Sequence, residues 1–423
     1  MINQQTLDPS TRAWISVTET NPTTGQKTTH DFLDTIGFTY SSDILQLGDP
    51  FCVSVPNPDG QYTSMLKVGS KITLRLQNPL VQENVWTLKA LGVIVKRRVE
   101  SSGNGTIIQL DCADLGWHLL NNSAPLWRGL YGNFTKLITD PAWIDPSWGI
   151  DTSNFRQDNK QNRALKINNG RAGVQIAFQN LQAASIPQRI QSEPGDKVAD
   201  ILITYARRLN YLINVACDGV FQLFRPDYKQ DPLYHLEYHG LGEASSNPNN
   251  ILSASLEEDI SGRWTQALCV GEIVLNSVTK QPSLSPNATK FRGQVSIEDE
   301  LPFVHRLTFS DGEIFNGQDS APLAFWRAKQ DKYNSFRATY RVKSHHQNGI
   351  WWEADTMCSV NDTVNGLQGN YYVSSVMYSR DDQGDMTEVN LRLPNLLQAY
   401  FDHPKKNEKI KTDKGVYLIK TTI

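Results

Sequence analysis

The sequence predicts a mainly β fold with α+β parts. Three observations support this prediction: apolar and polar residues alternate in several short segments, turn-forming residues separate these segments, and one amphipathic helix precedes a hairpin. An alternation of period two places one face of a strand in the core and the other face outside it. Short strands with such punctuation are typical of a small antiparallel barrel or a sandwich.

The first third of the chain contains the clearest alternation. Apolar side chains occupy every second position in residues 13–18, 71–76 and 107–112, which predicts three strands with one buried face each. Residues 93–95 are Val-Ile-Val, a run without alternation that is compatible with burial on both faces. Turn-forming residues separate these segments at 57–60, 68–70 and 101–105.

Residues 121–190 are irregular and follow a short helix expected at 116–120. Trp127, Trp143 and Trp148 lie there among prolines, glycines and asparagines. Disordered loops are poor in tryptophan, so we interpret this segment as an elaborated insertion that packs through its aromatic side chains.

The clearest helix is expected next. Its apolar stripe at helical period consists of Val198, Ile201, Leu202, Tyr205 and Leu209. Asp196 is a suitable N-cap. Two apolar runs then flank Asp218-Gly219, which is a strong signal for a hairpin over 211–225.

The C-terminal half is expected to contain a second group of strands. A polar loop or arm is predicted at 276–300, and a helix capped by Ser320 is predicted to continue to Phe336. The tail after Pro394 is polar, and we expect it to be extended until it meets a partner. The predicted strands begin near Ile251 and also cover 264–273, 339–343, 351–360, 371–378 and 387–393.

Composition excludes several classes of protein. The chain has 423 residues, 41 basic and 44 acidic, with a net charge of −3, which excludes a disordered chain and a generally basic, nucleic-acid-binding surface. The five cysteines are scattered, so neither a zinc site nor a disulfide framework is expected. We expect buried free thiols in a protein that is assembled in a reducing cytoplasm. The N-terminus lacks the pattern of a signal peptide, and no run approaches about 18 apolar residues. We therefore expect a soluble protein without a membrane span.

Three groups of residues resemble metal ligands, and each has a simpler interpretation. His235, Glu237 and His239 would share one face of a strand, but a polar, exposed strand face is favoured over a metal site. The pair His345–His346 precedes a turn and is expected to be solvated. Asp381, Asp382 and Asp385 lack the spacing of a calcium loop, so a hairpin turn is favoured.

No catalytic, cofactor-binding or metal-binding residue is predicted. Residues 257–259 and 299–300 offer carboxylates, but a sequence run does not establish a cleft. No nucleophile elbow, P-loop or dinucleotide fingerprint is present. Lys96, Arg97 and Arg98 form a local basic cluster on a strand, which is a candidate contact for a partner or a polyanion.

In its order of segments the sequence resembles the baseplate hub proteins of contractile-tailed bacteriophages, of the Mu-like or late-control-D family. This family is related to the N-terminal part of type VI secretion spike proteins. The similarity depends on the strand phrase at 66–75, the hairpin phrase from 92 to 114, the helix and Asp-Gly hairpin at 195–226, and the closing strands at 351–356 and 372–393.

The resemblance implies two tail-tube-like antiparallel β-barrel domains, an α/β domain and insertions. We expect a first barrel at 1–120, an irregular insertion followed by a helix-plus-hairpin domain at 121–245, a second, discontinuous barrel at 246–290 and 335–395, an arm and helix at 291–334, and a C-terminal tail at 396–423.

The resemblance also implies a structural function without catalysis. Three copies would present six barrels and join a six-fold tail tube to a three-fold spike, with part of the DNA channel between them. We expect the chain to form a homotrimer that contacts the tail tube or its initiator protein, the central spike and the baseplate wedge proteins. The tape-measure protein and phage DNA are expected to pass through its channel. The expected location is the tail baseplate of the virion, after assembly in the host cytoplasm.

Two alternatives remain open. The first is a tail-associated cell-wall hydrolase, which would need paired carboxylates in a cleft. The second is a tail protein that binds a glycan or receptor through Trp127 or Trp143 in the Trp-rich insertion.

Overall fold

The computed structural model divides the chain into two compact units. The first comprises residues 1–253, 340–368 and 373–390, and the second comprises 254–339, 369–372 and 391–423. The structure describes residues 11–21, 23–33, 35–77, 85–102, 105–126, 128–129, 137–157, 190–192, 194–208, 211–224, 226, 228–240, 248–271, 292–297, 301–311, 317–381, 384–394, 409–412 and 415–418.

The N-terminal strands of the first unit form an antiparallel sheet in the order β3-β4-β7-β6-β5-β1-β2. Its strands are β1 (Arg12–Thr20), β2 (Lys27–Phe32), β3 (Gly37–Asp43), β4 (Pro50–Pro56), β5 (Lys71–Gln77), β6 (Thr87–Ser102) and β7 (Gly105–Asp114), with a short 3-10 turn η1 (Pro58–Gly60) after β4.

The predicted alternation is confirmed in these strands. Ile15 and Val17 of β1 and Leu74 of β5 are fully buried, whereas the residues between them are more accessible. Gly92 in β6 shows how closely two strands approach, because a Cβ atom there would lie 1.9 Å from the carbonyl oxygen of Ala113 in β7. Residues 93–95 are buried at Val93 and Ile94, but Val95 is exposed next to a β-bulge.

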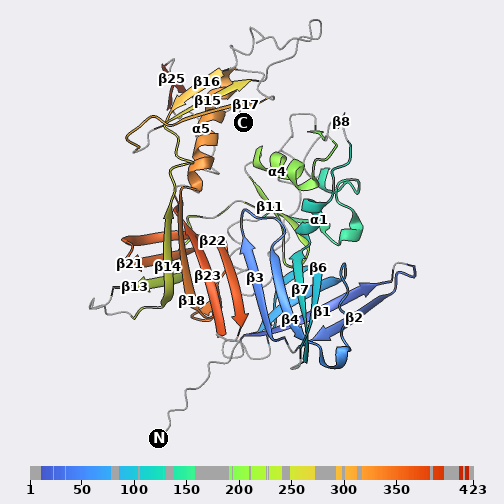
Figure 1. The fold of residues 1–423 in the computed structure, drawn as a ribbon. Coiled ribbons are helices and arrows are strands. Elements are labelled where there is room, and N and C mark those ends of the chain that lie inside the picture. The colour runs from blue at the N-terminus through green and yellow to red at the C-terminus, as the bar shows by residue number, and fades with distance from the viewer. Residues whose placement is uncertain are drawn as a thin grey trace. The chain divides into compact units, whose positions relative to one another are not determined.

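A second group of strands continues the same sheet. It contains β21 (Thr356–Asp362), β22 (Leu367–Asp381) and β23 (Gly384–Arg392), and β13 (Tyr234–Tyr238) pairs in parallel with β21. Residues 375–380 of β22 pair antiparallel with residues 38–43 of β3, so two segments more than 300 positions apart in the chain lie side by side in one sheet (Figure 1). The sheet order ends with β14 (Ile251–Glu258) and β18 (Phe336–Lys343) beyond β23.

The first unit also contains helices and shorter strands outside this sheet. The expected helices are α1 (Gly116–Asn121) and α4 (Val198–Arg208), and the expected hairpin is β11 (Leu212–Val215) with β12 (Val220–Phe224). The insertion contains a strand that periodicity did not reveal, since β9 (Asp151–Gln157) pairs in parallel with β12. The remaining short elements are β8 (Arg128–Gly129), η2 (Pro146–Trp148), β10 (Ile190–Gln191), β19 (His346–Gln347) and β20 (Ile350–Trp351).

Among its described residues, the second unit contains a five-stranded sheet and a helix. The order of its strands is β17-β15-β16-β24-β25. The helix α5 (Gly317–Tyr333) contributes Ala324 and Ala328 to a small core with Ala267, Cys269 and Val295. The strands are β15 (Gln266–Gly271), β16 (Arg292–Ser296), β17 (Arg306–Asp311), β24 (Lys409–Thr412) and β25 (Gly415–Leu418).

Three expectations for this half of the chain were wrong. The helix begins at Gly317 and ends at Tyr333, so Ser320 lies inside it and Phe336 belongs to β18. Residues 292–296 form a strand within the segment expected to be a loop. Part of the tail forms β24 and β25, because strand pairing within the unit satisfies its backbone groups without another chain.

The mainly β class with α+β parts is confirmed. The closure of these strands into two barrels stays a prediction.

Candidate functional site

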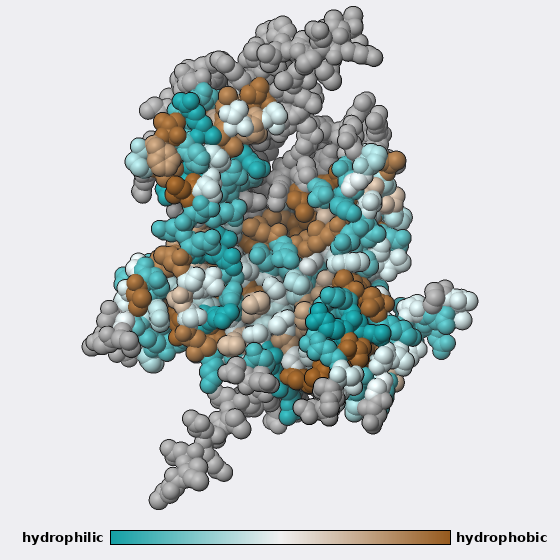
Figure 2. All heavy atoms as spheres, viewed as in Figure 1, coloured by the Kyte–Doolittle hydropathy of each residue, from teal (hydrophilic) through white to brown (hydrophobic). Residues whose placement is uncertain are grey.

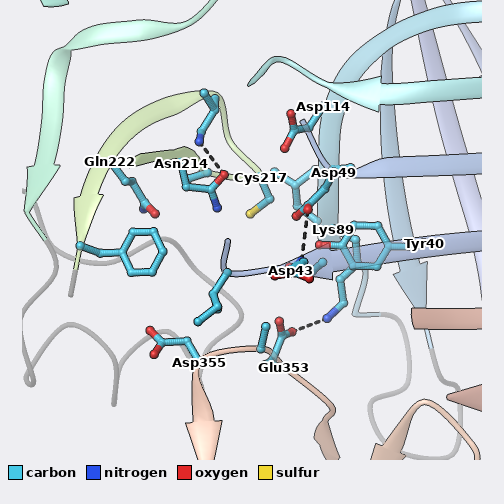
Figure 3. A pocket seen from close by; sticks show the side chains of 18 of the residues that line it. Tyr40, Asp43, Asp49, Lys89, Asp114, Asn214, Cys217, Gln222, Glu353 and Asp355 are labelled. Atoms are coloured by element: carbon cyan, nitrogen blue, oxygen red, sulfur yellow. Dashed lines mark hydrogen bonds and ion pairs between the residues drawn. The ribbon is translucent and has the colours of Figure 1, made fainter. Parts of the chain in front are cut away.

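The first unit contains a cavity of about 140 Å³. It lies where strands β3 and β6, the hairpin β11–β12 and residues 353–356 meet, and Figure 3 shows their side chains around one common space. Its polar lining consists of Tyr40, Ser42, Asp43, Asp49, Thr87, Lys89, Asp114, Asn214, Cys217, Gln222, Glu353, Asp355 and Thr356.

The only lysine of this lining is held by an acid and two aromatic rings. Lys89 is 4% exposed although it lies near the start of β6. Its ammonium group donates a hydrogen bond to the Oε1 atom of Glu353 and lies 4.8 Å from the ring centroid of Trp351 and 5.3 Å from that of Tyr378. A buried ammonium requires such partners, so the charge of Lys89 is used in contacts that stabilise the fold.

Two buried carboxyl groups lie on another side of the cavity. Burial raises the pKa of Asp114 to about 7, and burial together with the negative charge of Asp114 raises the pKa of Asp49 well above its ordinary value. Perturbed acids in a cavity are candidates for acid–base chemistry. Both also bind the backbone: Asp114 Oδ1 accepts from Gly116 N at 2.7 Å, where α1 begins, and Asp49 Oδ1 accepts from Asp43 N at 3.2 Å.

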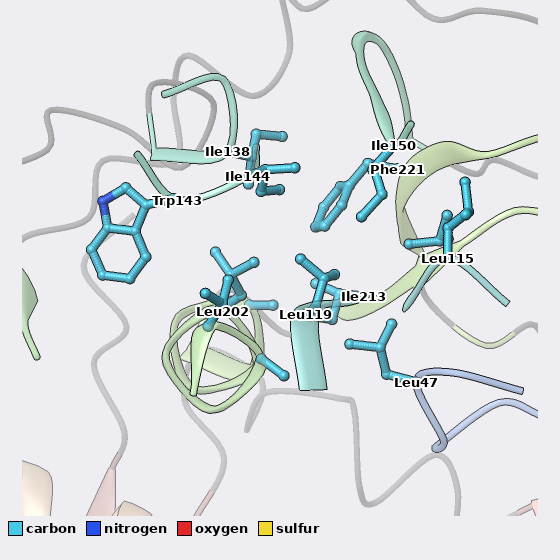
Figure 4. Close-up of a cluster of buried hydrophobic side chains, with 14 of the residues drawn as sticks. Leu47, Leu115, Leu119, Ile138, Trp143, Ile144, Ile150, Leu202, Ile213 and Phe221 are labelled. Carbon is cyan, nitrogen blue, oxygen red and sulfur yellow. The ribbon is translucent and has the colours of Figure 1, made fainter. Parts of the chain in front are cut away.

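An apolar cluster of the same unit contains one of the predicted contact residues. Trp143 is 0% exposed and lies in a core with Leu119, Ile138, Leu202 and Phe221 (Figure 4). The prediction that Trp143 contacts a partner is therefore wrong for the folded chain, because its ring is covered by the chain's own side chains. Within the described residues 137–157 of the predicted insertion, Trp143 and Trp148 pack against this core. Trp127 lies outside the described residues.

The basic cluster on β6 divides into two kinds of residue. Arg97 is half-buried and donates from Nη1 to the carbonyl oxygens of Thr63 and Leu66, at 2.7 and 2.9 Å. Lys96 and Arg98 are exposed. Exposed Val95 and Val99 lie on the same strand. Figure 2 shows that hydrophobic and hydrophilic residues are intermixed on the visible face of the molecule. A mixture of apolar and basic groups suits contact with a protein better than contact with phosphates alone.

The structure brings together His235, Glu237 and His239. Glu237 Oε1 lies 2.6 Å from His235 Nε2, and Glu237 Oε2 lies 2.9 Å from His239 Nε2. Asn361 Nδ2 donates to Glu237 Oε2 at 2.9 Å. Glu237 is buried, so the two imidazoles and the amide compensate the burial of its carboxylate. Within the described part of the chain, no group of three such side chains is arranged to hold a metal ion.

The expectation of a solvated histidine pair was wrong for His345. Its ring is fully buried, with Nδ1 at 3.1 Å from Thr11 Oγ1 and Nε2 at 3.0 Å from the carbonyl oxygen of Ser379. Asp385, which sequence reasoning placed in a turn, accepts from Thr11 N at 2.6 Å. His345 and Asp385 therefore both anchor Thr11, the residue just before β1. Asp382, from the same predicted turn, lies outside the described residues.

Sequence reasoning missed the lining of the cavity, notably Asp49, Asp114, Lys89 and Glu353. One signal was available: Lys89 stands between Leu88 and Ala90 in an apolar part of a strand, where a lysine needs a partner. The partner itself could not be found, because Glu353 lies 264 positions away.

Two structures of phage tail proteins share this architecture over nearly their whole length. The first is the 43 kDa tail protein of prophage MuSo2 from Shewanella oneidensis, with a TM-score of 0.64, 14% identity, and coverage of 92% of this chain and 99% of that one. The second is the tail protein from Neisseria meningitidis MC58, with a TM-score of 0.64, 15% identity, and coverage of 93% and 99%.

The chain has a phage tail-protein fold. A chain of the Francisella PdpA-VgrG complex is more distantly similar, with a TM-score of 0.51, 7% identity, and coverage of 91% of this chain and 58% of that chain. The expected resemblance to phage baseplate hub proteins is thus confirmed at the level of the fold. No protein-family model and no curated protein matches the sequence.

The tail-protein fold contains no helix, among the residues described, that is long and apolar enough to span a membrane.

Proposed function

We propose that this chain is a structural protein of a phage tail baseplate. The observation that supports this function best is the extent of the structural likeness, which covers 92–93% of this chain and 99% of each of two phage tail proteins. A likeness of this extent is not confined to a common strand motif.

We further propose that the chain is the hub, and that it assembles as a homotrimer between a six-fold tail tube and a three-fold spike. The pairing of β3 with β22 supports this proposal, because it joins an N-terminal and a C-terminal group of strands within one chain. Three copies of a protein with two such groups would offer six quasi-equivalent groups to the tube. The first group corresponds to residues 1–120, and the second to parts of 246–290 and 335–395.

In this assembly part of the sheet surface would line a channel for the tape-measure protein and phage DNA. The net charge of −3 is compatible with a lining that does not retain phosphates. A structure of the trimer with a strongly basic channel wall would contradict this part of the proposal.

The hub function is tested by light scattering of the purified chain, alone and mixed with tail tube and spike proteins from the same phage. We expect three copies of the chain in each complex with the spike. A chain that remains monomeric in the presence of both partners would exclude the hub function, whereas the fold would be unaffected.

The cell-wall hydrolase alternative keeps one supporting observation, the raised pKa values of Asp49 and Asp114 beside a cavity. Against it, both carboxyl groups bind backbone N–H groups, which is a structural use. A peptidoglycan-release assay decides between the two: release by the wild-type chain that is lost in Asp49→Asn would support the hydrolase. The buried ring of Trp143 is not accessible to a glycan, which argues against the glycan-binding alternative at this residue.

A further inference from the structure

The outer edge of β13 is closed by side chains. On one side β13 pairs in parallel with β21, from Tyr234 opposite Cys358 to Tyr238 opposite Asp362. On the other side, no strand among the described residues pairs with the backbone groups of His235, Glu237 and His239. These groups bond to side-chain amides and, at Glu237 O, to the backbone N–H of Asn250.

These bonds satisfy every outward backbone group from 235 to 239. His235 N donates to Gln347 Oε1 at 2.7 Å, and His235 O accepts from Gln347 Nε2 at 2.7 Å and from Asn250 Nδ2 at 2.8 Å. Glu237 N donates to Asn250 Oδ1 at 2.9 Å, and Glu237 O accepts from Asn250 N at 3.2 Å.

The third residue follows the same rule. His239 N donates to Asn249 Oδ1 at 2.8 Å, and His239 O accepts from Asn249 Nδ2 at 3.1 Å. A primary amide offers one acceptor and two donors and can therefore replace a peptide group of a neighbouring strand. The three amides thus act together in the place of an edge strand.

The amides are held in position by the fold. Gln347 belongs to the tight hairpin β19–β20, whose turn residues Asn348 and Gly349 have φ values of 52° and 81°, as a two-residue type I′ turn requires. Asn249 and Asn250 immediately precede β14. The cap therefore consists of side chains from two segments that the rest of the unit fixes.

The strand under the cap is suited to pair with a copy of itself. Its sequence, Tyr-His-Leu-Glu-Tyr, is nearly symmetric about Leu236. In an antiparallel pair centred there, His235 of each copy would face Glu237 of the other copy, and Tyr234 would face Tyr238. Both charged positions carry outward backbone groups, so this register also satisfies the hydrogen bonds of the pair.

We propose that Asn249, Asn250 and Gln347 form an edge cap that prevents β13 from pairing with β13 of a second copy of this chain. Uncovered strand edges are templates for association, and proteins that assemble through other surfaces must block them. This inference does not depend on the proposed hub function, since it concerns an edge that stays closed whatever the chain binds elsewhere.

The test compares Asn250→Ala/Gln347→Ala with Gln46→Ala/Gln61→Ala in the full-length chain. The control removes two amides from exposed positions outside the cap. Hydrogen exchange at 235 and 237 and light scattering are measured over a range of concentrations, and circular dichroism verifies folding. Gln347→Ala alone is a milder variant if the double variant does not fold.

We expect the cap variant to exchange its amides at 235 and 237 about tenfold faster when dilute. At high concentration the mass of the cap variant should rise to twice the wild-type mass, because two particles pair through β13. The control should keep the wild-type mass. A folded cap variant with unchanged exchange would overturn the proposal. A variant with faster exchange that keeps the wild-type mass at all concentrations would overturn it as well.

Discussion

Lys89 of β6 donates a hydrogen bond to Glu353, a residue 264 positions later in the chain. This contact joins the N-terminal strands to the segment before β21 across the wall of the cavity (Figure 3). The side chain of Lys89 is almost fully buried, whereas that of Glu353 is 40% exposed. The two partners therefore depend on the contact to different degrees.

Lys89→Ala is expected to lower the free energy of unfolding by about 2 kcal/mol, because the substitution removes the ion pair and the packing against Trp351 and Tyr378. Glu353→Gln should cost about 1 kcal/mol, since an amide oxygen can still accept the hydrogen bond. Urea denaturation measures both values. The exposed pair Lys67–Glu19, 2.8 Å apart, provides the control, and Lys67→Ala should change stability by less than about 0.5 kcal/mol. Equal losses at the two lysines would contradict this interpretation.

His345 should make the first unit less stable in mild acid. Burial lowers its pKa, although the carboxylate of Asp385, 3.9 Å away, acts in the opposite direction. Below about pH 6.5 the histidine of the unfolded chain binds a proton, while that of the folded chain does so only at lower pH. Stability should therefore fall as the pH decreases below about 6.5. Urea denaturation at several pH values should give a smaller decrease for His345→Gln, and an identical decrease in both proteins would exclude this role.

Asp114 should make the first unit less stable as the pH rises, which is the opposite of the effect of His345. Its pKa of about 7 in the folded chain lies above the value of about 4 for an unfolded chain. The folded state therefore binds the proton more tightly, and the contribution of Asp114 to stability is lost as the pH rises from about 4 to about 7.

Asp114→Asn is expected to flatten this decline, because an amide does not ionise and its oxygen can still accept from Gly116 N. The free energy of unfolding between pH 4 and 8 is the measurement. Asp111 of the same strand is exposed, and Asp111→Asn serves as the matched control with an unchanged pH profile. If the two variants gave the same profile, the raised pKa would not affect stability.

Arg97 and Arg98 should respond differently although they are adjacent. Arg97→Ala removes two hydrogen bonds to carbonyl oxygens and should cost about 2 kcal/mol of stability. Arg98→Ala and Lys96→Ala should cost less than about 0.5 kcal/mol. If the exposed pair contacts a baseplate partner, these two variants should weaken binding in a pull-down assay while their melting temperatures stay unchanged. Lost stability at Arg98 would show that the cluster is structural throughout.

The sequence by itself determined the class of the fold and several of its elements. Period-two burial predicted β1, β5 and β7, and the Asp-Gly turn predicted β11–β12, because these signals depend only on neighbouring residues. The order of the segments was sufficient to indicate the tail-protein fold. Local signals were weaker where elements lie in polar stretches, and β9, β16, β24 and β25 were missed for that reason.

Only the tertiary structure decided which polar residues are functional candidates and which are part of the core. Sequence reasoning treated Trp143 and the His345 pair as accessible, but both Trp143 and His345 are buried by segments far away in the chain. The partners of Lys89 and of His235 N lie 264 and 112 positions away, in Glu353 and Gln347. Burial and pairing at such separations arise from the register between distant strands, which local periodicity does not contain.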